Sequence, residues 1–402
     1  MDPQALIAAT VSAGMPAPPT DMPAPFWFIQ LFKVLGFTLH VVPMNLWFAG
    51  LLLAAWLHCC GSEHGKRFAA RLLRQMPILI AFGINFGIVP LLFLQVAYYR
   101  FFYPATILMA WHWLYIVVLL IPAYYGVYVY VLGLRDRAAD MPLWRRAAGW
   151  VAAVLFVGIG FLFANGLSLM TNIRGWPALW ETHSVAGAAL GTGLNTADAT
   201  LWPRWLLMFG LALGTTAAWA ILDAAWLAGK ESPEYKRWAS GFAAKLITAS
   251  VLWVASAGSW YVFGAWRPEI RSEMVGLPMA TLTGVTAFSP GLVWLLICLH
   301  RGREIARPMA ALVGLAQLGV LGLNAVSRQV VQNLELRKVA QDPELSQFVQ
   351  LLGLKPYLDV GAQPVSVDWG PLVMFLATFV VGMGVVAWMV AQVLKAKPSE
   401  AR

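Results

Sequence analysis

Two histidines lie in stretches that are otherwise apolar enough to cross a membrane. His40 stands in FTLHVVPMNLWFAG and His112 in LMAWHWLYIVVLLI. An ionisable side chain at membrane depth costs at least a few kcal/mol, so such a residue points to a function. A neutral imidazole is the usual axial ligand of a b-type haem. A histidine that is hydrogen-bonded to a neighbouring helix is the alternative interpretation.

The depth of each histidine follows from the rise of a helix. His40 lies 17 residues from the expected inner end of its span near Leu57, about 26 Å at 1.5 Å per residue. His112 lies 21 residues from Gly133, about 32 Å on the same rise. The two rings are therefore expected at a similar depth, in the outer half of the membrane. If both bind one iron, that haem relays electrons; if His112 lies off the iron, an open position remains for oxygen or nitric oxide.

Four arginines are expected at the outer face, at the level of the two histidines. A haem there needs cations for its propionates, which cannot stay charged in lipid without partners. The alternative for each arginine is contact with lipid headgroups or solvation of a helix end. The four candidates for cofactor binding are Arg100, Arg174, Arg204 and Arg328.

Two further charged residues fall inside predicted spans, near their inner ends. Asp223 and Lys245 lie at comparable depth. They would pair with each other, or Lys245 would extend its ammonium to the interface while its stem stays in lipid. The third interpretation is a proton path, because protons that cross a membrane need titratable carriers.

The elements that must position these residues are membrane helices. Of the 402 residues, 60% are hydrophobic and 12% are charged. About 20 consecutive apolar residues are needed to cross roughly 30 Å of hydrocarbon. The sequence predicts an all-α polytopic membrane bundle in one transmembrane domain, 1–402, with an outer N-terminal segment, 1–25, and longer outer loops, 172–204 and 328–369. A short amphipathic helix is expected in DPELSQFVQLLGLKPYL (342–358). The nine apolar stretches are 26–57, 77–99, 105–133, 147–171, 205–228, 242–264, 279–299, 308–327 and 370–394.

The net charge of +9 is better explained by topology than by nucleic-acid binding. With nine alternating spans, 18 of the 28 basic residues fall on the side that holds the C-terminus. The positive-inside rule therefore predicts a cytoplasmic C-terminus and an outer N-terminus. The three cysteines form no CxxC and no CxxCH, so disulfides, zinc ribbons and covalently attached haem are not indicated.

Four segments, in order, resemble subunit I of cytochrome bd-type terminal oxidases. FTLHVVPMNLWFAG is similar to the first-helix histidine segment of that family, and FGINFGIVPLLFLQ to its second-helix Asn-Phe segment. FLFANGLSLMTNIRGW is similar to the Ala-Asn-Gly ending of helix 4, and SRQVVQNLELR to the Gly-Arg-Gln-Pro-Trp motif after helix 8. The resemblance implies that His40 binds haem at the oxygen site and that Arg328 binds propionate.

The departures from that family are equally specific. Only AWRPEIRSEMVGLP separates the sixth and seventh stretches, so the long quinol-binding loop is missing. The family's low-spin haem histidine is replaced by Leu207 or Met208 in PRWLLMFG, and its haem-binding glutamate before the motif arginine by Ala325. His112 stands at the first helix-3 glutamate of the family, and no glutamate is expected in any of the nine spans.

Together these observations predict a haem-binding subunit of a cytochrome bd-like respiratory complex in the bacterial cytoplasmic membrane. It would transfer electrons, with or without oxygen reduction, through a b- or d-type haem. The expected partners are the lipid bilayer, other membrane subunits and a cytochrome c-type electron donor, and not nucleic acid. The alternative is a haem-free structural or assembly subunit of such a complex.

Overall fold

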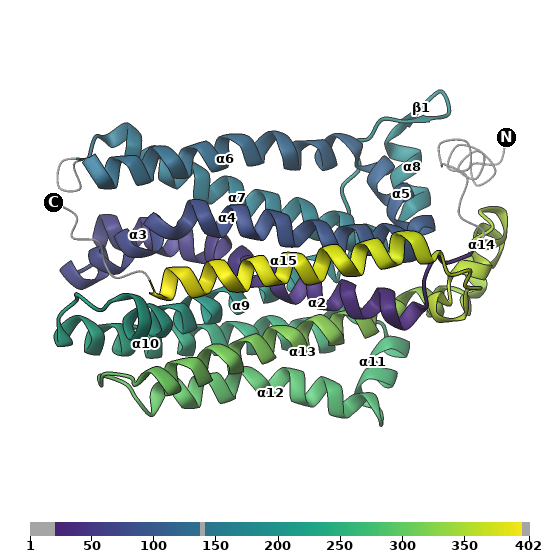
Figure 1. Cartoon of the computed structure of the whole chain (residues 1–402). Helices are drawn as coiled ribbons and strands as arrows, with labels where there is room; N and C mark the ends of the chain where they lie inside the picture. Colours follow the sequence, from purple (N-terminus) through teal and green to yellow (C-terminus); the bar gives the residue numbers. More distant parts are fainter. Residues whose placement is uncertain (1–20, 137–140, 396–402) are drawn as a thin grey trace.

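The protein is an all-α bundle of membrane-spanning helices (Figure 1). The computed structural model describes residues 21–136 and 141–395. In these ranges, nine helical segments are long and apolar enough to cross a membrane, which confirms the predicted fold. The chain is therefore a multi-pass membrane protein. The segments are α2 (Phe26–Asn45) continued by η1 (Leu46–Gly50) and α3 (Leu51–Cys60), α4 (Glu63–Ala97), α6 (Ala110–Asp136), α7 (Leu143–Leu169), α9 (Leu201–Leu222) continued by η3 (Asp223–Leu227), α10 (Pro233–Ser259) continued by η4 (Trp260–Ala265), α12 (Met279–Cys298), α13 (Arg307–Val339) and α15 (Trp369–Lys395).

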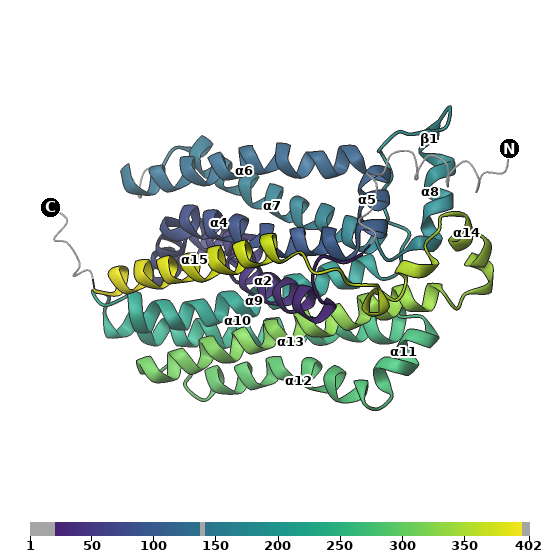
Figure 2. The same ribbon diagram turned by 45° about the vertical axis from the view of Figure 1, so that its right-hand side comes forward.

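Short helices gather at one end of the bundle, which we call the cap end (Figures 1 and 2). We call the opposite end, where α3 ends and α10 begins, the basic end. The predicted topology turns the cap end outwards, and this orientation stays a prediction. The elements of the cap end are α5 (Tyr99–Leu108), η2 (Ile173–Gly175), α8 (Trp176–Thr182), the hairpin of β1 (Ser184–Val185) and β2 (Ala188–Ala189), α11 (Pro268–Val275), η5 (Pro343–Leu345), α14 (Ser346–Leu351), η6 (Lys355–Tyr357) and η7 (Val360–Ala362).

The segment before α2 is tied to the cap end by backbone hydrogen bonds. Of the predicted N-terminal segment 1–25, residues 1–20 lie outside the described residues. The Met22 N–H donates to the Pro364 carbonyl, and the Ser366 N–H donates to the Met22 carbonyl, each at 2.9 Å. The entry into the first span is thus fixed against the segment that leads to α15. As predicted, 342–358 contains a short helix, α14.

The first and fifth spans form the centre of the bundle. In each of them 56% of the most apolar window is buried, whereas none of the window in α15 is. α2 packs against α4, α9 and α13, so its side chains meet three different neighbours. α15 lies outside this group, where Phe375 contacts Phe28 and Phe93 edge to face near the cap end (Figure 1). A site on the faces of α2 that meet α4, α9 and α13 is therefore lined by protein.

Three of the spans contain a π turn, in which each N–H bonds to the carbonyl five residues earlier. η1 interrupts the first span after Asn45, η3 closes α9 from Asp223 onwards, and η4 closes α10. Such turns are rare and occur mostly as single turns inside α-helices, frequently at functional sites. Asn45, directly before η1, donates from Nδ2 to the Thr215 hydroxyl of α9 at 2.8 Å. The backbone irregularity in the first span is thus held by a buried side-chain bond.

Two boundaries differ from those expected from hydropathy. α4 begins at Glu63 instead of near 77, because Ser62 accepts a capping bond from the Gly65 N–H and the helix continues through a charged segment. α13 continues to Val339, so the expected outer loop 328–369 starts only at residue 340 and Arg328 is a helical residue. Glu335 lies in this extension of the helix, beyond the apolar stretch 308–327 in which no glutamate was expected.

At the cap end, α11 is tied to the end of α13 by an ion-pair group. The Glu273 carboxylate pairs with Lys338 and, at 3.1 Å, with Arg337. The hydrogen bond from Lys338, with the neighbouring positive charges, holds the pKa of the Glu273 carboxyl below its usual value. A carboxyl with a lowered folded-state pKa stabilises the fold above its unfolded pKa, and this contribution is lost as the pH falls through the folded pKa.

We therefore expect Glu273→Gln to lower the free energy of unfolding at neutral pH by less than about 1 kcal/mol, since the group is more than a third exposed and screened by solvent. Melting temperatures measured against pH should fall less steeply for this variant than for the wild type below pH 4.5. Glu269→Gln, an exposed position on the same helix, is the matched control. Identical pH profiles for wild type and Glu273→Gln would contradict the assignment.

Candidate functional site

His40 lies in the interior of the first span, on the face of α2 that meets α4. Its Nδ1 is 2.7 Å from the carbonyl oxygen of Gly83. A carbonyl only accepts, so Nδ1 carries the proton and, in the neutral ring, Nε2 keeps its lone pair. A backbone carbonyl on one ring nitrogen is the usual device that orients a metal-binding histidine. The ring is half-buried, so one side of it remains accessible.

Two glycines of α4 permit this close approach. A Cβ at Gly87 would come within 2.8 Å of the His40 ring, and a Cβ at Gly83 within 2.2 Å of the Trp47 ring. Any side chain at Gly87 would therefore displace the imidazole from the Gly83 carbonyl. The glycine spacing of α4 thus positions His40, and the segment FGINFGIVP contains both glycines.

His112 lies on a different helix and has different neighbours. It is two residues from the start of α6, and α4 packs between α6 and α2 (Figure 1). The start of α6 is held by the segment after the hairpin, where the Trp111 N–H donates to the Gly191 carbonyl at 2.9 Å. The nearest aromatic ring to His112 is that of Tyr115, with centroids 6.1 Å apart, whereas His40 faces Trp47. No contact between the His40 and His112 rings is found among the described residues.

Lys33 is a buried cation that the sequence analysis did not select. It lies seven residues before His40, and its side chain is 8% exposed. The ammonium donates to Gln329 Oε1 at 2.6 Å and to Gln332 Oε1 at 3.2 Å, and it lies 4.2 Å from the Tyr98 ring centre. An ammonium has three N–H donors, so one remains. No carboxylate pairs with Lys33 in the part of the chain that the structure describes.

Arg328 is the second cation of this region without an acidic partner. Its guanidinium lies over the Phe37 ring, 4.9 Å from the ring centre. Residues 33, 37 and 40 share one face of α2, because they are spaced by four and three residues. The Arg328 guanidinium therefore lies beside the face of α2 that carries Lys33 and His40. No ion pair or side-chain hydrogen bond of Arg328 occurs within residues 21–136 and 141–395.

Arg204 differs from Arg328 in being neutralised by a carboxylate. It forms an ion pair with Glu335 of α13, and its Nε donates to the Tyr261 hydroxyl at 2.6 Å. The other Glu335 oxygen is buried and has no donor among the described residues. Counting Lys33, Arg328, Arg204 and Glu335 in their ordinary charge states, this buried group has a formal charge of two positive.

The two remaining arginines predicted to hold the cofactor lie at the cap end and have other contacts. Arg174, in η2, pairs with Asp342 and, at 2.7 Å, with Glu344, which joins the loop after α7 to the segment after α13. Arg100, in α5, lies over the Tyr357 ring, 4.9 Å from its centre. Neither is brought to the face of α2 that carries His40 by any contact of the described residues.

Asp223 binds an arginine, not the lysine considered from the sequence. The Arg71 Nε and Nη2 donate to the two carboxylate oxygens at 2.8 and 2.9 Å, and the Tyr235 hydroxyl donates at 3.3 Å. Lys245 is exposed on α10, as expected for a side chain that extends along lipid to the interface. The two residues do not form an ion pair in the described structure, and the proton path stays a prediction.

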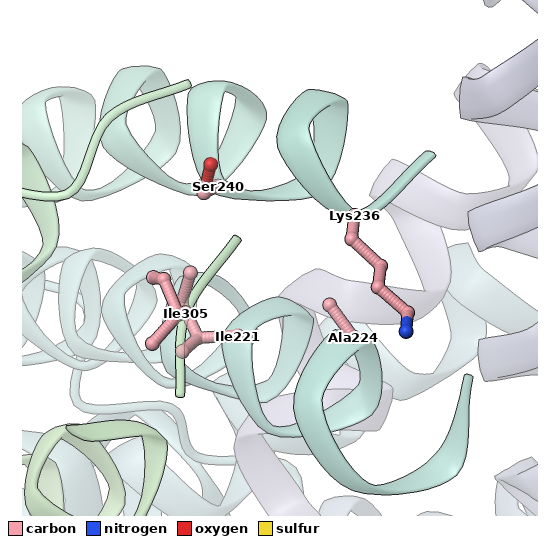
Figure 3. Close-up of a pocket in the computed structure, with 5 residues that line it drawn as sticks. All are labelled: Ile221, Ala224, Lys236, Ser240 and Ile305. Carbon is pink, nitrogen blue, oxygen red and sulfur yellow. The ribbon is translucent and has the colours of Figure 1, made fainter. Parts of the chain in front are cut away.

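The donor set fits a haem better than a metal ion held by protein ligands alone. Among the residues that the structure describes, no three His, Cys, Asp or Glu side chains gather as a metal-binding group. A haem iron needs only one or two protein ligands, whereas its two propionates need cations. The cavities at the basic end (Figure 3) and beside Arg100 do not include His40, so a macrocycle would have to lie against the exposed part of that ring.

Comparisons with known proteins agree with this architecture at the level of the fold. No protein-family model and no curated protein matches the chain. Among solved structures, the chain is similar to the bd oxidase from Geobacillus thermodenitrificans, with a TM-score of 0.60 and 13% sequence identity over 93% of this chain and 98% of that chain. At such identity the likeness shows a shared fold. The cytochrome c-type donor expected from the sequence stays a prediction.

Proposed function

We propose that this chain is a haem-binding subunit of a respiratory membrane complex of the cytochrome bd type. The observation that carries the proposal is the face of α2 on which a tautomer-fixed imidazole, His40, lies seven residues from a buried ammonium, Lys33. Seven residues correspond to about 10.5 Å along the helix, which is comparable with the span from the iron of a haem to its carboxylate arms. The fold shared with a bd oxidase supports the same assignment.

The residues have separate parts in this proposal. His40 would bind iron through Nε2, while the Gly83 carbonyl keeps the proton on Nδ1 and holds the ring in place. Lys33 and Arg328 would each receive one propionate, which would bring the charge of the buried group from two positive to zero. Such a haem supplies one-electron redox chemistry and, with a single protein ligand, a position for a diatomic gas. His112 is left outside this ligand set, and the other partners would be membrane subunits of the complex.

The test is a measurement of haem on the purified native protein. Pyridine haemochrome analysis should give at least one non-covalent haem per chain, and carbon monoxide should change the reduced spectrum if one axial position is open. A colourless preparation that remains folded would refute the proposal and favour the haem-free structural subunit. A spectrum that carbon monoxide does not change would point to a second axial ligand.

Arg328 offers a test that is independent of iron ligation. We expect Arg328→Gln to weaken haem retention by roughly 10- to 100-fold, because a charge-assisted hydrogen bond contributes about 1.5–3 kcal/mol. Haem loss to an excess of apomyoglobin measures this effect. Arg174→Gln is the matched control, since its guanidinium is already paired with Asp342 and Glu344. Equal haem loss from both variants would contradict propionate binding by Arg328.

A further inference from the structure

One face of α4 is open along most of the membrane-spanning part of that helix. α6 lies along one side of α4, and near the cap end Phe93 of α4 contacts Phe375 of α15, with ring centres 5.2 Å apart (Figure 1). Only 22% of the most apolar window of α4 is buried, against 56% in the first span. The open face carries a regularly spaced row of exposed and half-buried residues. We call this row the α4 seam, and its members are Ile78, Ala81, Asn85, Ile88, Leu92 and Gln95.

The spacing of the α4 seam is that of an interface between two helices. Ile78, Asn85 and Leu92 are seven residues apart, and each is followed three residues later by another member of the seam. This is the a and d pattern of helices that pack with a left-handed crossing, the geometry of most membrane bundles. Ile78, Ile88 and Leu92 are 62%, 48% and 55% exposed, so none of the described helices covers the seam. Apolar side chains alone would suit lipid equally well, so the polar member is decisive.

Asn85 lies near the middle of the seam and of the membrane. It is three residues from the centre of the apolar stretch 77–99, about 4.5 Å at 1.5 Å per residue. Its side chain is exposed, and its Nδ2 donates to the Ala81 carbonyl of the same helix at 2.8 Å. A primary amide has two N–H donors and one acceptor oxygen, so one N–H and Oδ1 have no partner among the described residues. Polar groups without partners are costly in hydrocarbon, so this face is poorly suited to lipid.

We infer that the α4 seam is an interface with a second copy of this chain. Both copies cross the membrane in the same orientation, so a two-fold axis along the membrane normal sets the two seams parallel. In a parallel pair each a position faces its equivalent, which brings the Asn85 side chains of the two copies together. An amide both donates and accepts, so these side chains can bond each other. A different partner would need a polar group of its own at this depth. The inference does not depend on haem binding.

The test is self-association of the full-length protein in lipid vesicles. Donor-labelled and acceptor-labelled protein are mixed in dioleoyl phosphatidylcholine and diluted with lipid, and energy transfer gives the dimer fraction. We expect a reversible dimer that Asn85→Leu weakens by roughly 3- to 30-fold, the range for a side-chain hydrogen bond between membrane helices. Ser256→Ala is the matched control and should change nothing, because Ser256 is an exposed polar residue of α10 that bonds only to the Leu252 carbonyl of its own helix.

Cross-linking locates the contact independently of its strength. In a chain whose three cysteines are replaced by serine, Ile88→Cys should form an intermolecular disulfide when the vesicles are treated with copper phenanthroline. Phe288→Cys, at an 82% exposed position of α12, should not. A protein that stays monomeric at every lipid ratio, a dimer that Asn85→Leu leaves unchanged, or cross-linking that does not distinguish the two positions would overturn the inference. Cross-linking of residue 88 to a different polypeptide in native membranes, without a product between two copies, would assign the seam to another subunit and would likewise overturn it.

Discussion

His40→Ala is expected to remove haem from the protein, leaving a folded chain with no absorbance at the haem wavelengths. In our proposal His40 is the only ligand that this chain gives to that iron. The change therefore removes every bond between this chain and the iron. The Gly83 carbonyl remains and can accept from a free imidazole placed in the space left by the side chain. Added imidazole should therefore restore part of the spectrum, which a merely structural histidine would not allow.

His112→Ala is the matched control for this experiment. The structure gives His112 neighbours on the far side of α4 from His40, so this variant should keep its full haem content and spectrum. Complete haem loss from His112→Ala as well would show that both rings bind one iron, as the alternative from the sequence has it. Retention of haem in His40→Ala would end the assignment of His40.

Asp223→Asn is expected to lower the free energy of unfolding by about 1–3 kcal/mol, because it removes the carboxylate that receives two hydrogen bonds from Arg71 and leaves that arginine only Glu231, at 3.6 Å. The carboxylate is 1% exposed and receives two hydrogen bonds from Arg71, whose side chain is 21% exposed. Thermal or denaturant unfolding in detergent measures the loss. The same pair neutralises the charge of Asp223, and a proton path through this residue stays a prediction.

The partner variants show whether the cost comes from charge or from packing. Arg71→Met should be destabilising by a similar amount, whereas Asp223→Leu combined with Arg71→Met should recover most of the loss, because an apolar pair has no charge to desolvate. Tyr235→Phe removes one 3.3 Å hydrogen bond and should cost about 1 kcal/mol. A double variant that is less stable than either single one would contradict this account of the pair.

The spans could be predicted from hydropathy because each needs about 20 apolar residues, whatever its neighbours are. His40 and His112 stood out for the same reason, as ionisable groups in apolar segments. Lys33 did not stand out, because a lysine near the end of a span usually extends its ammonium to the aqueous interface. Its burial depends on Gln329 and Gln332, which lie almost 300 residues away in the chain.

The roles of the arginines were the least predictable part of the site. By their positions alone, at the outer ends of spans, Arg204 and Arg328 were equivalent, and only the family resemblance set Arg328 apart. What separates them is Glu335, which becomes a neighbour of Arg204 only because α13 continues past its apolar stretch. Capping and packing determine how far a helix continues beyond its hydrophobic segment, and a hydropathy calculation takes neither into account.

The π turn η1 has a consequence for any comparison of this chain with distant relatives. A π turn amounts to one residue inserted into an α-helix, and one residue corresponds to about 100° of rotation. An ungapped alignment through residues 46–50 with a chain that lacks the turn would match one half of the first span and displace the other by one position. If the half before η1 is matched, the residues of α3 that face α4 and α7 would then be assigned to the wrong sides of the helix. Relatives are therefore best aligned as two half-spans, with His40 as the reference for the first and Leu51 for the second.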